Sequence, residues 1–282
     1  MSKALAGLRV IDMTHNQAGP ACAQMLGFLG ADVIKLEEPK GGDIARAQNN
    51  DELFFLAFNA NKRSLTLNLK ADEAKAHFRK IIAQSDVLIE NFGPGALDRL
   101  GLGWKDLQKI NPRLIFATIK GFGTYGPHAH MKSFEPIAQA MGGAMCVSGF
   151  ADGPPTYNWP SIGDSGTGMH MAIAILAAIN QRHATGRGQH VEVSMQESVL
   201  NLIRVSLREH QRTGVPVRTG NQLARRCRAR PTPARPAALT TGSISLPRRR
   251  CGLRYARCWG GPNWSRTRSS KQRTTVGQTA PR

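Results

Sequence analysis

Residues 221–282 contain no acidic residue, although they hold 15 lysines and arginines. The first 220 residues are nearly balanced, with 23 basic and 19 acidic side chains. The formal net charge of +19 therefore comes mostly from the C-terminal segment and does not by itself indicate a nucleic-acid-binding protein. Arginine, proline, serine and threonine dominate this segment without helical or strand periodicity, so we predict a disordered basic tail. A coding frame read out of register also produces such a sequence.

The sequence has little cysteine and no long apolar run. Its five cysteines form no C-x-x-C or Cys/His grouping, which argues against zinc and favours reduced thiols. The longest apolar helical stretch, residues 169–179, is shorter than the roughly 20 residues that span a bilayer. Residues 1–9 lack an apolar stretch of signal-peptide length. We therefore expect a cytoplasmic protein without a membrane partner or a bound metal.

The first 220 residues contain a regular alternation of short apolar runs and helical periodicity. Apolar runs predict strands at 8–13, 31–36, 65–69, 86–89, 114–119 and 191–194. Helical spacing of apolar residues predicts helices at 21–29, 71–84, 96–100, 104–110, 135–141, 165–183 and 196–212. Strands that alternate with helices pair in parallel through right-handed crossovers. We therefore predict an α/β fold for residues 1–220, with a Rossmann-like, mostly parallel sheet between flanking helices.

Ligands of such a sheet bind beyond the carboxyl ends of its strands. Three predicted loops lie there, at residues 14–20, 90–95 and 120–126. The first does not match the G-x-G-x-x-G fingerprint of dinucleotide-binding proteins, so a dinucleotide site is not indicated. It is either a βα turn that receives a phosphate or pantetheine chain, or an ordinary turn whose glycine eases packing.

The segment GDSGTGMH, residues 163–170, precedes the longest predicted helix. It places Asp164 at or beside the N-terminus of that helix, where unpaired amides and the helix dipole favour an ionised carboxylate. Asp164 on this reading is either a nucleophile or a simple N-cap, since aspartate is a preferred capping residue. The glycines at 163, 166 and 168 are poor helix formers, and we interpret them as allowing a ligand to approach closely.

Several segments together resemble the class III CoA-transferases, and most closely those that move CoA from formyl-CoA to oxalate. They are LRVIDMTHNQAGPACAQMLGFLGADVIKLE, NKRSLTLNLK, ENFGPGALDRLG, ADGPPT, GDSGTGMH and MQESVLNLIRVSLREHQR, and they span nearly all of residues 5–213 in the family's order. The resemblance implies that Asp164 is the nucleophile. It attacks the acyl-CoA carbonyl, and the reaction passes through a mixed anhydride and an aspartyl-CoA thioester. Backbone amides near Gln17 and Ala18 are candidate oxyanion donors.

The resemblance also implies a set of CoA contacts. Coenzyme A is then a substrate, and no cofactor is implied. Arg99 and Lys132 suit the anionic nucleotide end of CoA, and Gln17 and Glu135 are expected nearer the reacting centre. His15 is either catalytic or a structural loop residue. The implied contacts are Gln17, Ala18, Leu67, Asn68, Leu69, Lys70, Asn91, Phe92, Gly93, Arg99, Lys132, Ser133, Phe134 and Glu135.

The sequence departs from the family at three places. Glu38 occupies the position of a nucleotide-contacting arginine, and Phe134 occupies that of a tyrosine. The family chain continues into a smaller domain, a glycine-rich loop and a return segment, and two chains interlock as a homodimer. Nothing in residues 221–282 matches that half, so the tail replaces the family's small domain.

Four other functions stay open at this stage. An acyl-CoA racemase of the same superfamily needs a second acid/base histidine, and residues 132–135 hold none. Another class III transferase with a succinyl-CoA donor is the nearest enzyme alternative. A truncated, inactive fragment is the third. A nucleic-acid-binding protein is the fourth, because the basic tail binds phosphate non-specifically, although it lacks the spacing of a known module.

Overall fold

Six parallel strands form one sheet in the order β3-β2-β1-β4-β5-β6 in a computed structural model that describes residues 3–46 and 52–221. The predicted basic tail therefore lies outside the described residues, apart from Asn221. The strands are β1 (Arg9–Asp12), β2 (Asp32–Glu37), β3 (Arg63–Thr66), β4 (Val87–Glu90), β5 (Ile115–Lys120) and β6 (His190–Ser194). Every pairing is parallel, so the predicted α/β class and parallel sheet are confirmed.

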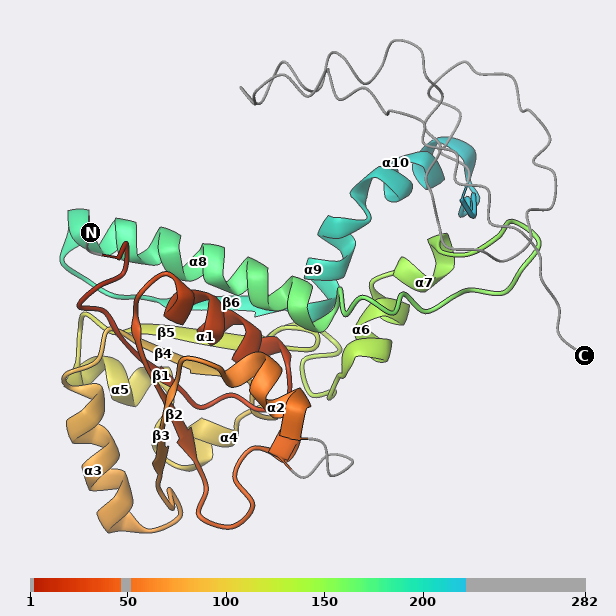
Figure 1. Ribbon diagram of the computed structural model, residues 1–282. Helices are drawn as coiled ribbons and strands as arrows, with labels where there is room; N and C mark the ends of the chain where they lie inside the picture. Colours follow the sequence, from red (N-terminus) through yellow and green to blue (C-terminus); the bar gives the residue numbers. More distant parts are fainter. Residues whose placement is uncertain (1–2, 47–51, 222–282) are drawn as a thin grey trace, which may run out of the picture. The chain divides into compact units, whose positions relative to one another are not determined.

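Helices cover both faces of this sheet, as Figure 1 shows. The helices are α1 (Ala18–Phe28), α2 (Glu52–Asn59), α3 (Asp72–Ile82), α4 (Ala96–Arg99), α5 (Trp104–Ile110), α6 (Glu135–Met141), α7 (Ala144–Val147), α8 (Asp164–Thr185), α9 (Met195–Leu202) and α10 (Arg204–Thr213). A 3-10 turn, η1, spans Ile44–Arg46. The helices α1 and α8 pack on one face, and α3 and α5 pack on the other.

The two cores follow from the alternation of side chains along each strand. In β1, Val10 joins the core beneath α1 and α8, whereas its neighbour Ile11 joins the core beneath α3 and α5. In β4, Ile89 and Leu88 divide between the same two cores. Successive strand residues point to opposite faces, so a strand that is buried on both faces is apolar throughout.

Most predicted elements are confirmed, with three differences. The helix predicted at 196–212 is two helices, because Ile203 between α9 and α10 has φ −97° and ψ 10°, which interrupts the helical backbone. The helices α2 and α7 lie in segments where the sequence predicted none. The first helix, predicted at 21–29, begins three residues earlier at Ala18, with Gln17 in the N-cap position.

The strand order reverses between β1 and β4, which are neighbours in the sheet although β2 and β3 intervene in the chain. Loops that leave two such strands diverge to opposite faces and open a crevice at their carboxyl ends. The loops after β1 and β4 therefore frame the expected ligand site. Among the described helices, none has the length and apolar character needed to cross a membrane.

Candidate active site

A pocket of about 340 Å³ lies where the strand order reverses. The loops after β1, β4 and β5, the segment before α6 and the start of α8 all contribute to its wall. Of the residues singled out from the sequence, those that line it are His15, Gln17, Ala18, Asn91, Phe92, Gly93, Lys132, Ser133, Phe134 and Asp164. His15 and Asp164, which are 149 positions apart in the chain, are thus brought to one place.

Asp164 is the first residue of α8 and is only 6% exposed. Gly163, with helical φ and ψ, takes the N-cap position, so Asp164 does not cap its own helix. Within the described part of the chain, no group donates a hydrogen bond to the Asp164 carboxylate. The simple capping role that the sequence left open for Asp164 is therefore wrong, and its carboxylate is free to react with a ligand in the pocket.

Glu135, from the first turn of α6, caps α8 instead. Its Oε1 accepts the backbone N–H of Gly163 at 3.0 Å, and its Oε2 accepts the backbone N–H of Asp164. Gln139, one turn later on α6, donates from Nε2 to Glu135 Oε1 at 2.6 Å. Gln139 also binds the backbone N–H and C=O of Asn158, which anchors the loop before α8. Glu135 thus lies beside Asp164, but it is not among the residues that line the pocket, and its contact with CoA stays a prediction.

The electrostatic surroundings of Asp164 differ from the expectation. Burial in the pocket wall, together with the nearby Glu135 carboxylate, raises the pKa of Asp164 to about 7. The dipole of α8 alone favours ionisation, but it is outweighed by the loss of solvent and the neighbouring negative charge. The expectation that the helix start keeps Asp164 ionised does not allow for burial and Glu135, which both favour the protonated carboxyl.

Gln17, the N-cap of α1, reaches across to the start of α8. Its Nε2 donates to Ser165 Oγ at 2.9 Å, so the Gln17 side chain lies one residue from Asp164. The backbone N–H groups of Gln17 and Ala18 have no acceptor among the residues that the structure describes. Free amides at a helix N-terminus are suited to bind a developing oxyanion.

Two loops are joined across the crevice by Asn91 and Phe92. The Asn91 side chain accepts the backbone N–H of His15 and donates to its C=O, each at 2.8 Å. The Phe92 ring packs on the His15 imidazole with a centroid distance of 5.2 Å. Burial lowers the pKa of His15 below its usual value of 6.5, so the imidazole is neutral at pH 7. Asn91 and Phe92 thus contact both the backbone and the ring of His15, which favours a structural role for His15 over a catalytic one.

A buried network of charges underlies the loop after β1, and no local motif predicted it. Lys62 Nζ lies 2.8 Å from Asp12 Oδ2, and Lys35 Nζ lies 2.9 Å from Asp43 Oδ2. Asp12 Oδ1 accepts the backbone N–H of Thr14 at 2.9 Å. Burial alone would raise the pKa of Asp12, but Lys35 and Lys62 outweigh it and lower that pKa to about 2. This network fixes the backbone from which Gln17 projects.

Some of the residues singled out from the sequence lie away from the pocket wall. Leu67 and Leu69 pack against the core beneath α3 and α5, and Asn68 accepts the backbone N–H of Lys70 at 3.1 Å. Arg99 Nη1 donates to Pro94 C=O at 3.1 Å. Neither residues 67–70 nor Arg99 line the pocket, so any contact they make with CoA involves a part of the molecule that extends beyond it.

The glycines of the GDSGTG segment serve helix packing. A Cβ on Gly168 would lie 2.6 Å from Ala18 O, and a Cβ on Gly163 would lie 2.9 Å from Ala138 Cβ. A Cβ on Gly166 would meet Leu202. Gly168 and Gly163 therefore let α1 and α6 approach α8, and their interpretation as positions for close ligand approach is wrong, whereas Gly166 faces only the movable end of the Leu202 side chain.

Comparisons with known proteins agree with the geometry. A family model described as CoA-transferase family III matches residues 5–242. A formyl-CoA:oxalate CoA-transferase of Streptomyces avermitilis is 54% identical over 217 residues, which cover 75% of this chain and 53% of that enzyme. The Escherichia coli O6:H1 enzyme of the same name is 51% identical over 217 residues, covering 75% of this chain and 52% of its own length. The chain thus spans about half the length of these curated relatives.

A solved structure shows the same architecture. The crystal structure of a CaiB/BaiF family protein from Brucella suis superposes with a TM-score of 0.75 and 35% sequence identity. The match covers 78% of this chain and 61% of that one.

Proposed function

The chain belongs to CoA-transferase family III, and on that basis we propose that it transfers CoA from formyl-CoA to oxalate, with Asp164 as the nucleophile. One observation carries the assignment of Asp164. Its carboxylate is buried in the wall of the pocket, and the capping of α8 that would otherwise occupy it is done by Glu135.

The reaction proceeds in four steps. The ionised Asp164 carboxylate attacks the formyl carbonyl, the C–S bond breaks, and a formyl-aspartyl anhydride and CoA thiolate form. The thiolate attacks the aspartyl carbonyl of the anhydride, which releases formate and leaves an aspartyl-CoA thioester. An oxalate carboxylate then attacks this thioester and gives an aspartyl-oxalyl anhydride and the thiolate. Thiolate attack at the oxalyl carbonyl gives oxalyl-CoA and restores Asp164.

The residues around Asp164 have distinct parts in this proposal. The free amides of Gln17 and Ala18 stabilise the oxyanion at each tetrahedral stage. The pKa of Asp164 near 7 keeps a substantial ionised fraction at neutral pH and gives a carboxylate more basic than an exposed one. Lys132, at the outer wall of the pocket, attracts the phosphates of CoA.

The reaction is tested by incubating the full chain with formyl-CoA and oxalate and measuring oxalyl-CoA by mass spectrometry. We expect oxalyl-CoA from the wild type and a loss of at least about a thousandfold with Asp164→Ala. Hydroxylamine added during turnover should trap a hydroxamate on Asp164. Turnover that survives Asp164→Ala contradicts the nucleophile. Product from succinyl-CoA but not from formyl-CoA contradicts the donor. A wild type that binds CoA without turnover indicates that the transfer needs the remaining half of the family chain.

Location and assembly are part of the same proposal. Cys22 and Cys146 are free thiols in the structure, which is typical of a reducing compartment and supports a cytoplasmic location. A homodimer follows from the family resemblance, and size-exclusion chromatography with light scattering on the full chain tests it. Residues 1–220 are proposed to form the CoA-binding domain.

A further inference from the structure

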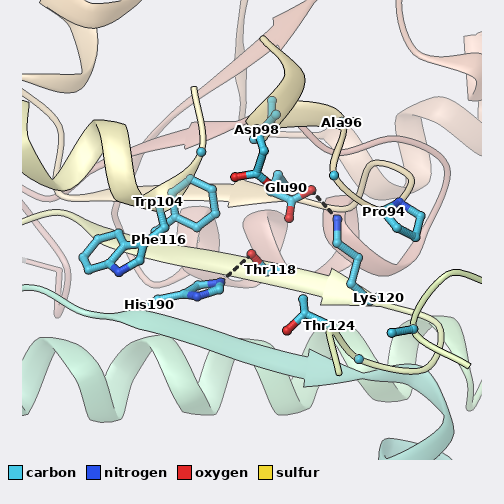
Figure 2. Close-up of a pocket in the computed structure, with 15 residues that line it drawn as sticks. Glu90, Pro94, Ala96, Asp98, Trp104, Phe116, Thr118, Lys120, Thr124 and His190 are labelled. Carbon is cyan, nitrogen blue, oxygen red and sulfur yellow. Dashed lines mark hydrogen bonds and ion pairs between the residues drawn. The ribbon is translucent and has the colours of Figure 1, made fainter. Parts of the chain in front are cut away.

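A buried ion pair joins the carboxyl ends of β4 and β5. Lys120 Nζ lies 2.8 Å from Glu90 Oε2, and the two side chains are only 10% and 5% exposed. Figure 2 shows the Lys120 side chain reaching from the end of β5 to the Glu90 carboxylate. The pair lies in the wall of a second cavity of about 220 Å³, and Lys120 also lines the candidate active site. Both residues fall within predicted loops that were expected near a ligand, but the sequence assigned neither an individual role.

The two side chains hold the backbone of Phe92 from both sides. Glu90 Oε2 accepts the Phe92 N–H at 3.0 Å, and Lys120 Nζ donates to the Phe92 C=O at 2.6 Å. Hydrogen bonds with a charged partner are stronger than neutral ones. One residue of the loop after β4 is therefore fixed by two charged groups, both of which belong to strands.

Phe92 transmits this placement to the pocket wall. It lines the candidate active site, and its ring packs on His15 of the opposite loop. The neighbouring Asn91 side chain binds the backbone N–H and C=O of His15. The position of Phe92 therefore sets the separation of the two loops between which a ligand lies.

We propose that Lys120 and Glu90 are positioning residues, which clamp Phe92 so that the loop of residues 91–93 is preorganised to bind the CoA thioester. The inference rests on the proposed function for the identity of the ligand. Lys120 and Glu90 take no direct part in the reaction in this proposal, and their expected effect is on the affinity for CoA. Preorganisation raises affinity because the loop loses less conformational freedom when the ligand binds.

The chain offers a matched control at the opposite end of β4. Arg182 Nη2 lies 2.9 Å from Asp86 Oδ1 just before that strand begins. Asp86 Oδ2 accepts the backbone N–H of Arg9 at 2.8 Å, and Arg182 donates to Arg113 C=O at 3.1 Å. This pair also holds backbone groups on both sides, but it is remote from the pocket lining.

The experiment compares two double variants of the full chain, Lys120→Met with Glu90→Leu and Arg182→Met with Asp86→Leu. Replacing both members avoids leaving one buried charge unpaired, which strongly destabilises a protein. CoA affinity is measured by isothermal titration calorimetry, and thermal midpoints are recorded for both. Hydrogen exchange at the Phe92 amide, followed by NMR, reports the clamp without any ligand.

We expect the first variant to bind CoA about tenfold more weakly than the wild type and to lose protection at the Phe92 amide. The control variant should keep its CoA affinity and its hydrogen exchange at the Phe92 amide within about twofold of the wild-type values, whatever its thermal midpoint. CoA affinity that is unchanged in the first variant, or equally reduced in both, overturns the positioning role. A wild type that does not bind CoA contradicts the proposed function. The clamp is tested separately by hydrogen exchange, and unchanged exchange at the Phe92 amide in the first variant overturns it.

Discussion

The carboxylate of Glu135 accepts the backbone N–H of Asp164, although the two residues are 29 positions apart. A residue from α6 thus supplies the cap of α8, and the first side chain of α8 stays free. The same contact places a second carboxylate next to Asp164 and raises the pKa of Asp164. One interaction therefore both positions the candidate nucleophile and makes it more basic.

Asp164→Asn should stabilise the protein at high pH. The folded-state pKa of Asp164 is about 7, above its ordinary value of 3.8, so the folded protein holds this proton more tightly than the unfolded chain. The free energy of unfolding of the wild type therefore falls as the pH rises from about 4 to about 7, by on the order of 4 kcal/mol. Urea unfolding should show Asp164→Asn to be more stable than the wild type at pH 8 and close to it at pH 4. A difference that is the same at both pH values contradicts the assignment.

Glu135→Gln should lower the pKa of Asp164. Burial of Asp164 persists in this variant, but the neighbouring negative charge is gone. Titration of the Asp164 side-chain carboxyl by carbon-13 NMR measures the change. The glutamine oxygen still accepts an N–H at the start of α8, so stability should be largely retained. Glu135→Ala should lower the same pKa and also cost about 1 kcal/mol, because α8 loses its cap. An unchanged pKa in both variants shows that burial alone sets it.

Gly168→Ala should separate α1 from α8. The added methyl group would lie 2.6 Å from Ala18 O, and a backbone atom can yield only if the whole helix moves. We expect a loss of about 1–3 kcal/mol and weaker catalysis, since Gln17 and Ala18 begin α1. Gly166→Ala is the control, because its methyl group meets only the flexible Leu202 Cδ1. Alanine favours the helix there, so its stability should be equal or slightly higher. Equal losses in both variants contradict the close approach of α1.

Lys62→Met should destabilise the protein at neutral pH by about 3 kcal/mol, because it removes a partner of the fully buried Asp12. The pKa of Asp12 is about 2 in the wild type, below its ordinary 3.8, so its stabilisation is complete above about pH 4 and is lost as the pH falls toward 2. In the variant this pKa rises, and protonation relieves the buried charge. The difference from wild type in urea unfolding should therefore shrink at pH 3.5. Lys75→Met, which removes the partner of the exposed Asp72, should change little at either pH.

The sequence predicted those helices and strands whose apolar spacing is complete within one element. The apolar run at 114–119 and the helical spacing at 104–110 each lie within one element, and the structure confirms both as β5 and α5. The helix predicted at 196–212 fails at Ile203, where nothing in the periodicity marks the break between α9 and α10. Helix α2 was missed because its residues, ELFFLAFN, are apolar on most sides and show no polar face to predict a surface helix.

The residues of the candidate site also divide into those that local motifs predicted and those that only distant contacts revealed. The resemblance carried by local motifs brought Gln17, Asn91 and Asp164 forward, and the structure gathers all three around one pocket. The partnership of Lys120 with Glu90 has no local motif, because the two residues are 30 positions apart and meet only when β4 and β5 pair. The GDSGTG glycines were misread for the same reason, since their neighbours lie on other helices.

By itself the sequence indicated the α/β alternation and the family and singled out Asp164 as the candidate nucleophile, because periodicity and motifs are properties of consecutive residues. Only the tertiary structure decided that Glu135 rather than Asp164 caps α8, that burial and Glu135 raise the pKa of Asp164, and that charged pairs fix the loops on both sides of the pocket. Those properties depend on burial and on distances between residues far apart in the chain, and folding sets both.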